Sequence, residues 1–215
     1  MVRRRDAVKA TENGVAKSAN NEGSAATKPN RTRHDWVLAA LATLAGGGID
    51  AVKVERIART LNVSKGSFYW HFTDRAQLLS ALLDLWDEDF TRQLIDNAAH
   101  LPTPAERLGA VAREALVATM AGVDSARAEA AVQAWAARDE SAAARLRAIE
   151  AVRVGYIADE LASAGMPAAH AGAIAKALYM ALLGLYAARS YNPDLADDDA
   201  YLALVRIVLG QIGKK

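Results

Sequence analysis

The segment Val54–Phe72 reads VERIARTLNVSKGSFYWHF, and it decides the fold of the chain. Apolar side chains in its first half recur at the i, i+3, i+4, i+7 spacing of one buried helical face, which predicts a helix over Val54–Leu61. Asn62 follows, and asparagine tolerates the left-handed backbone of a tight turn. Ser64 is a good N-cap for a second helix over Lys65–His71. Two short helices joined by a polar turn have the pattern of a helix-turn-helix motif.

The exposed face of the second short helix carries the chemistry that a DNA groove requires. The major groove is wide enough for a helix, and its base edges carry a full code of donors and acceptors. Gly66 permits close backbone approach because no side chain holds the helix away from the DNA. Hydrogen-bond donors and flat groups come from Lys65, Ser67, Tyr69 and His71. Each of these residues taken alone has an ordinary structural explanation, so the prediction depends on their ordered combination.

Apolar periodicity predicts helices over most of the remaining chain, and no segment shows strand-like alternation of useful length. The first is expected over Thr32–Ala45, where Gly46, Gly47 and Gly48 end it. A long helix is expected to begin at Thr73, which Gln77 helps to cap, and to run to about Ala99. Further helices are expected at about 104–121, 125–137, 140–164, 168–190 and 198–212. The sequence therefore predicts an all-α fold.

Composition narrows the class of protein. The 215 residues are 52% hydrophobic and include no cysteine, which excludes disulfides, zinc–thiolate sites and cysteine nucleophiles. The start MVRRRDAVKA has no apolar run after its arginines, and no stretch approaches the roughly 18 apolar residues of a membrane span. We therefore expect a soluble cytoplasmic protein without membrane contact.

Charge is distributed unevenly along the chain. Residues 1–75 contain 13 Lys and Arg against 7 Asp and Glu, whereas residues 76–215 contain 13 against 18. A basic first third on an acidic remainder suggests a module that binds a polyanion. Residues 1–30 have no apolar periodicity and are interpreted as a flexible basic arm, either a solvated tail or an arm that touches DNA.

The longer segment IARTLNVSKGSFYWHFTDRAQLL closely resembles the signature of the tetracycline-repressor (TetR) family of transcriptional regulators. The resemblance runs from about Thr32 to Trp86. It implies a nine-helix, two-domain architecture, with a three-helix helix-turn-helix DNA-binding domain over 31–77 and a helical effector-binding and dimerisation domain over 78–215. Asn62 stands where the family usually has a turn glycine. Val52 and Lys53 stand where it often has a Thr or Ser cap.

The resemblance also implies a function: a homodimeric repressor that small-molecule effectors release from a palindromic double-stranded DNA operator, with no cofactor and no metal. Lys65, Ser67 and Tyr69 are expected to approach bases, and the other contacts to hold phosphates. Trp70 is expected either to pack at the seam between helices three and four or to touch the DNA backbone. The full set of implied DNA contacts is Thr32, Arg33, Lys53, Ser64, Lys65, Gly66, Ser67, Tyr69, Trp70, His71 and Arg75.

For the second domain, residues 78–215, only the expected arrangement of helices resembles the family. Aromatic and apolar side chains that suit an effector pocket are Trp86, Phe90, Met120, Trp135 and Tyr156, although plain core packing explains each of them equally well. The candidate dimer interface is Leu178, Leu182, Tyr186, Tyr201, Val205 and Val208, although these side chains also suit packing within one subunit. An apolar or aromatic effector fits this composition.

Two alternatives remain open. One is a DNA-binding regulator without a small-molecule effector, which the sequence barely separates from a ligand-responsive one. The other is a helical enzyme, for which the acidic cluster around Asp84 and Asp87 and the pair Asp96 and His100 are the candidates. No Glu-x-x-His pair, glycine-rich phosphate loop or nucleophile–base motif accompanies them.

Overall fold

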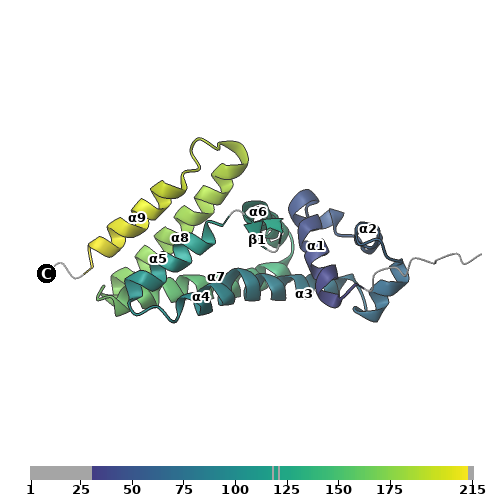
Figure 1. Cartoon of the computed structure of the whole chain (residues 1–215), viewed down its shortest axis with the longest axis horizontal. Coiled ribbons are helices and arrows are strands. Elements are labelled where there is room, and N and C mark those ends of the chain that lie inside the picture. Colours follow the sequence, from purple (N-terminus) through teal and green to yellow (C-terminus); the bar gives the residue numbers. More distant parts are fainter. Residues whose placement is uncertain (1–30, 118, 121, 213–215) are drawn as a thin grey trace, which may run out of the picture.

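The computed structural model describes residues 31–117, 119–120 and 122–212, so the predicted basic arm at 1–30 lies outside the described part. The N-terminal helices lie at one end of an elongated molecule and α8 and α9 at the other (Figure 1). In chain order the elements are α1 (Arg33–Gly47), η1 (Ile49–Ala51), α2 (Val54–Thr60), η2 (Lys65–Trp70), α3 (Arg75–Asp87), η3 (Glu88–Arg92), α4 (Gln93–Ala98), α5 (Pro104–Ala115), β1 (Thr119–Met120), β2 (Val123–Asp124), α6 (Ser125–Ala136), α7 (Glu140–Ser163), α8 (Ala168–Tyr191) and α9 (Asp198–Gly210). The nine α-helices within these residues confirm the all-α prediction.

The helix α1 begins as the sequence predicts, but it ends at Gly47, two residues beyond the predicted end at Ala45. Thr32 caps it through a capping box with Asp35, and Gly48 ends it with a φ of 70°. Its buried face carries Trp36, Leu41 and Leu44, each without exposed surface. These side chains form the centre of the N-terminal core, so α1 is the support on which the two short helices rest.

Three further predicted helix boundaries need correction. Asp74, not Thr73, caps α3, because its carboxylate accepts a 2.8 Å hydrogen bond from the Gln77 amide. The second short helix is a 3₁₀-helix, η2, and it ends at Trp70. The helix expected over 104–121 ends at Ala115. A two-residue antiparallel ladder, β1–β2, follows it, so the expectation of no strand fails at this point.

The long helix predicted from Thr73 to about Ala99 is present as α3, η3 and α4 in succession, but it is not uniform. Its middle segment, η3, has π-helical hydrogen bonding. A single π-helical turn inside an α-helix often accompanies a functional site. Here it brings the Phe90 ring to 4.2 Å from the Trp86 ring in a stacked arrangement.

The largest buried cluster crosses the predicted domain boundary between residues 77 and 78. It joins Trp36 and Leu44 of α1 to Trp86 of α3, Val132 of α6 and Ile149 of α7. The helix α6 contacts α1 on one side and α7 and α8 on the other (Figure 1). Any shift of α6 or α3 therefore bears directly on the helix that supports the short-helix pair.

The helix α8 corrects the expectation that no segment has the length and apolarity of a membrane span. An 18-residue window within Ala168–Tyr191 has a mean hydropathy of 1.5. A core helix passes the same test of length and composition, and 39% of that window is buried within the chain. Much of the apolar surface of α8 thus remains uncovered in a single copy.

Candidate nucleic-acid interface and internal cavity

The turn between α2 and η2 has the geometry that the sequence predicts. Asn62 has a φ of 56°, and it is the one non-glycine with positive φ among the described residues. The Val63 amide donates to the Ala58 carbonyl at 3.0 Å and closes the turn. The Ser64 hydroxyl accepts a 3.3 Å hydrogen bond from the Ser67 amide and caps η2. These bonds fix the direction in which η2 leaves the turn.

Phe68 anchors η2 to the core. Its side chain is fully buried, and its ring lies 5.3 Å from the Trp36 ring, edge to face. It also stacks on Phe72, again at 5.3 Å. With Phe68 facing inward, its neighbours Tyr69 and Trp70 face outward.

Tyr69 and Trp70 are 59% and 87% exposed, so the helix presents two aromatic side chains to solvent. The expectation that Trp70 packs at the seam between helices three and four is therefore wrong. Gly66 lies on the same element, and a Cβ there would meet only the Ser64 hydroxyl, at 3.7 Å. The fold itself does not require glycine at this position, whereas close approach of a ligand to the backbone would.

Lys65 is paired across the turn. Its Nζ lies 2.6 Å from Oε1 of Glu55 on α2, and both side chains are about half exposed. The hydrogen bond from Lys65 holds the pKa of the Glu55 carboxyl below its usual value, and the same bond raises the pKa of Lys65. Glu55 was not predicted from the sequence, although a carboxylate in the first turn of α2 was the available signal.

The remaining predicted DNA contacts fall into two groups. Lys53 and His71 flank the short helices at the α2 N-cap and the η2 C-cap. Thr32 and Arg33 serve the fold as well, because Thr32 caps α1 and the Arg33 guanidinium lies 4.8 Å from the centre of the Phe72 ring. Lys53, Thr32 and Arg33 are exposed.

Arg75 has a structural role that the sequence did not reveal. Its Nε donates to the Val52 carbonyl at 2.6 Å, and its Nη2 donates to the Ile49 carbonyl at 2.8 Å. These bonds tie the start of α3 to the loop before α2. The phosphate contact of Arg75 stays a prediction, because its side chain is exposed and its Nη1 donors take part in neither bond.

A cavity of about 90 Å³ lies in the C-terminal part, with α3, η3, α4, α5, α6, α7, α8 and α9 in its wall. Trp86, Phe90 and Tyr156 line it, as predicted for an effector pocket. Trp135 does not, because it is buried in the core that joins α6 to α1. The side chain of Met120 lies outside the described part of the chain.

A buried polar cluster in the cavity wall was not foreseen from the sequence. Arg153 on α7 pairs with Glu129 on α6 at 3.1 Å, and their side chains are 13% and 4% exposed. Arg153 also donates to the Thr91 hydroxyl at 2.8 Å and to the Tyr179 hydroxyl at 3.1 Å. One guanidinium thus joins α6, α7, α8 and the π-helical turn.

Burial and charge set the ionisation of this cluster. Burial opposes the charge on Arg153 and is the largest single effect, but the charge and hydrogen bonds of Glu129 and Tyr179 together outweigh it and raise the pKa of the guanidinium. Burial raises the pKa of Tyr179 to about 12. Burial and the nearby Glu129 charge also raise the pKa of Glu150. The opposite charges of Arg153 and Glu129 cancel, so the pair has no net charge.

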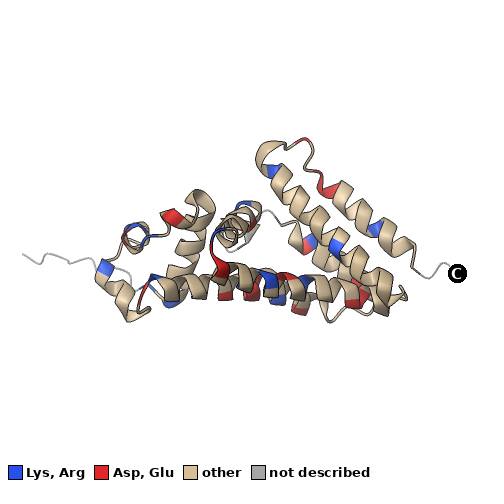
Figure 2. Ribbon diagram, turned by 180° about the vertical axis from the view of Figure 1, so that it is seen from behind, with Lys and Arg blue, Asp and Glu red and all other residues tan. Residues whose placement is uncertain are grey.

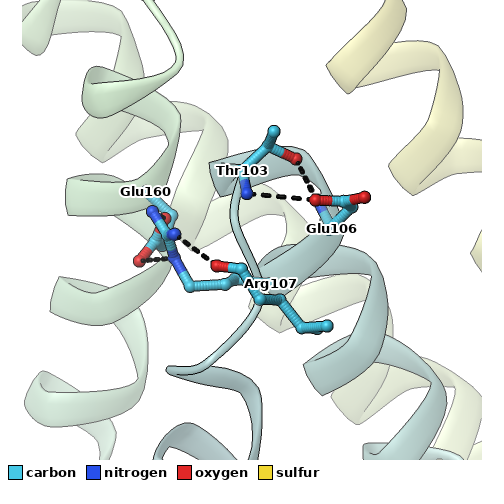
Figure 3. Close-up of polar contacts among 5 residues, drawn as sticks. Thr103, Glu106, Arg107 and Glu160 are labelled. Atoms are coloured by element: carbon cyan, nitrogen blue, oxygen red, sulfur yellow. Dashed lines mark hydrogen bonds and ion pairs between the residues drawn. The ribbon is translucent and has the colours of Figure 1, made fainter.

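A second ion pair ties α5 to α7. Arg107 donates through Nε and Nη2 to the two carboxylate oxygens of Glu160, at 2.9 and 2.8 Å (Figure 3). A capping box between Thr103 and Glu106 begins α5 beside it (Figure 3). Together these contacts fix α5 as one wall of the cavity, close to Tyr156.

Most of the side chains predicted for a dimer interface serve the single subunit. Leu178, Tyr201 and Val205 are buried against α5, and the Tyr186 hydroxyl donates to the Ala115 carbonyl. Four of the predicted set line the cavity: Leu178, Leu182, Tyr186 and Tyr201. Val208 packs half-buried beside them. Packing within the subunit thus accounts for residues that sequence periodicity alone placed between subunits.

Charged groups are unevenly spread over the described part. In Figure 2, Lys, Arg, Asp and Glu are interspersed along α3, α4 and α7, whereas α8 and α9 carry few of them. Within the described residues, no three His, Cys, Asp or Glu side chains gather as metal ligands would. Two acidic side chains of the long helix form ion pairs, Asp84 with Arg145 and Asp87 with Arg92.

Comparison with known proteins agrees with this geometry. Residues 37–82 match the family model described as bacterial regulatory proteins, tetR family. Over the whole fold, a TetR-family transcriptional regulator from Streptomyces coelicolor is similar, with a TM-score of 0.69 and 22% identity over 85% of this chain and 90% of that one. SmeT, the repressor of the Stenotrophomonas maltophilia multidrug efflux pump SmeDEF, has a TM-score of 0.62 and 19% identity over 84% and 89%. FadR from Bacillus subtilis in complex with stearoyl-CoA has a TM-score of 0.60 and 17% identity over 85% and 98%. At these identities the three structures establish a shared fold.

Proposed function

Since the chain belongs to the tetR family of bacterial regulatory proteins and is not an enzyme, we propose that it is a homodimeric repressor of transcription in the cytoplasm. It binds a palindromic DNA operator through η2, and a small molecule in the cavity releases it. The single observation that carries the proposal is the outward face of η2. There a capped helix, pinned by Phe68, presents Lys65, Tyr69 and Trp70 beside a glycine that the fold does not need.

On DNA, we assign base contacts to Lys65, Ser67 and Tyr69. Lysine donates to guanine acceptors, and hydroxyl groups bond either kind of base edge. Trp70, His71 and the cap residue Ser64 lie beside them and suit phosphates and sugars, which position a protein without specifying sequence. Residues 31–77 form the DNA-binding part of this proposal, and residues 78–215 form the part that senses and dimerises.

For the dimer, we propose the uncovered faces of α8 and α9. Met180 and Ile207 are 63% and 59% exposed, and Leu204 is 38% exposed. These helices carry few charges (Figure 2), as an interface between subunits requires. The occupant is a second copy of this chain, because reading two successive major grooves needs two η2 helices about 34–36 Å apart.

For release, we propose that occupancy of the cavity moves α6 and the α3–η3–α4 helix. Both contribute side chains to the cavity wall, and both contact α1. A small displacement in either one changes the separation of the two η2 helices in the dimer. The coupling between the two sites is expected to be worth about 1–3 kcal/mol. The stearoyl-CoA complex of FadR illustrates a ligand bound to a protein with this fold.

The direct test is selection of bound sites from random duplex DNA, followed by affinity measurements with the selected sequence. We expect two half-sites related by a two-fold axis, with centres about 10–10.5 base pairs apart or a multiple of that. The double variant Lys65→Ala/Tyr69→Ala should lose specific binding while its helical circular dichroism is unchanged. A control with Arg113→Ala, an exposed arginine on α5, should bind normally. Enrichment of no sequence, or full binding by the double variant, would overturn the proposal.

A further inference from the structure

Three residues that line the cavity each carry a buried polar atom that has no hydrogen-bond partner among the described residues. They are Nε1 of Trp86, Oγ of Ser125 and the hydroxyl oxygen of Tyr156. Trp86 is 1% exposed and Ser125 is 5% exposed, so bulk water does not satisfy either one. A buried polar group without a partner costs free energy, and proteins rarely leave several such groups in one place without a ligand or ordered water to meet them. Because all three residues line the same cavity, a partly polar occupant of that cavity is the partner that would satisfy them.

Hydrogen-bond chemistry sets what that occupant must offer. An indole N–H only donates, so Trp86 needs an acceptor. Hydroxyl groups such as those of Ser125 and Tyr156 donate or accept, and an acceptor suits them too. A ligand with an oxygen acceptor therefore meets the need of all three atoms, whereas a pure hydrocarbon meets none.

The charged groups of the wall are already engaged with one another. Arg153 and Glu129 are the only charged side chains among the described lining residues. The Arg153 donors go to Glu129, Thr91, Tyr179 and, at 3.5 Å, the Phe90 carbonyl. The other Glu129 oxygen accepts from Gln133 at 3.2 Å. An anionic or cationic ligand would have to break this pair in a buried place, so the free positions favour a neutral ligand.

The rest of the wall is apolar, with the stacked Trp86 and Phe90 rings on one side and aliphatic residues such as Leu94, Leu108 and Ile157 elsewhere. Ser125 is the first residue of α6, and Trp86 lies in the last turn of α3. Both helices contact α1. The polar atoms thus lie on the two elements that reach the DNA-binding part.

We infer that the effector is a neutral, largely apolar small molecule with a carbonyl-type oxygen, which accepts a hydrogen bond from Trp86 Nε1 and makes a second polar contact with Ser125. This inference rests on the effector role proposed above for the same cavity. It narrows that role to one chemical class: neutral ketones, esters or amides on an aromatic or aliphatic body.

Three probes with the same number of heavy atoms separate the classes: acetophenone as the neutral acceptor, cumene as the hydrocarbon and benzoate as the anion. Dissociation constants are measured by ligand-observed NMR with the full-length protein. We expect acetophenone to bind at least about tenfold more tightly than either other probe, the difference that one good hydrogen bond makes to a buried group. Ser125→Ala should remove much of that preference while cumene binding is unchanged. Trp86→Phe also changes the apolar wall, so its effect is measured as the ratio of acetophenone to cumene affinity in the same variant, which should fall. The matched controls Ser163→Ala and Trp135→Phe lie outside the cavity wall and should keep the preference.

Four results would overturn the inference. Cumene could bind as tightly as acetophenone, benzoate could bind more tightly, none of the three probes could bind, or both variants could leave the preference unchanged. Operator affinity, measured with the same preparations, tests the proposed function separately. If benzoate releases the operator, the effector role stands and the chemical class is wrong. If acetophenone binds with the expected dependence on Ser125 but operator affinity is unchanged, the class is correct and the effector role fails.

Discussion

The Oε1 atom of Glu55 lies 2.6 Å from the Nζ atom of Lys65 and joins the first turn of α2 to the first residue of η2. Both groups are about half exposed on the face that we assign to DNA. The carboxylate orients the lysine, and it also places a negative charge where phosphates would approach. Glu55 is therefore expected to weaken binding to any duplex and to make binding depend on the right bases.

Replacing Glu55 with Gln should strengthen binding to operator and to random duplex alike, by roughly threefold to tenfold at low salt, because one repulsive charge is removed. Fluorescence anisotropy over a salt series measures this. Asp194→Asn, a similar change in the loop after α8, should have little effect. Weaker operator binding with unchanged binding to random duplex would contradict the prediction and assign Glu55 a purely orienting role.

Trp70 provides a spectroscopic test of the proposed DNA surface. Of the four tryptophans, Trp70 is 87% exposed, whereas Trp36, Trp86 and Trp135 are at most 5% exposed. Iodide should quench a single accessible component of the fluorescence, and operator DNA should protect it. Trp70→Phe should remove that component with no change in thermal stability. Quenching that persists in the complex would exclude Trp70 from the interface.

The left-handed backbone at Asn62 should favour asparagine or glycine over other residues at this position. Its φ of 56° is left-handed, and its side chain is exposed. Asn62→Ala is expected to lower the free energy of unfolding by about 1 kcal/mol, because alanine tolerates this region poorly. Asn62→Gly should change it by less than about 0.5 kcal/mol. Urea unfolding of both variants gives the comparison, and equal stabilities would show that the turn relaxes.

Ile207 should be central to the dimer. A glutamate at this exposed position of α9 would bring two charges into a mostly apolar interface, so Ile207→Glu is expected to weaken dimerisation at least about hundredfold. Light scattering coupled to size-exclusion chromatography measures the mass. Val152→Glu makes the same kind of change on the exposed side of α7 and should remain dimeric. A dimeric Ile207→Glu protein would place the interface elsewhere.

Local features of the short-helix pair follow from sequence because their causes are local. The Asn62 turn, the Ser64 cap and the inward Phe68 depend on residues within a few positions of one another. The start of a helix is harder to predict where two neighbouring residues can both serve as the N-cap, as with Thr73 and Asp74. The end of α5 at Ala115 was missed because the next six residues, LVATMA, include no glycine or proline that would end a helix.

Sequence alone determined the all-α class, the helix-turn-helix and the exposed chemistry of η2, since helical periodicity and capping are written within single segments. Tertiary structure decided the roles that need residues far apart in the chain. Arg153 meets Glu129 and Thr91 across three elements, and Arg75 reaches the carbonyls before α2. It also assigned Leu178 and Tyr201 to the interior of one subunit and left Ile207 uncovered. A periodic pattern identifies the apolar side chains of a helix, but only packing decides which neighbour covers each one.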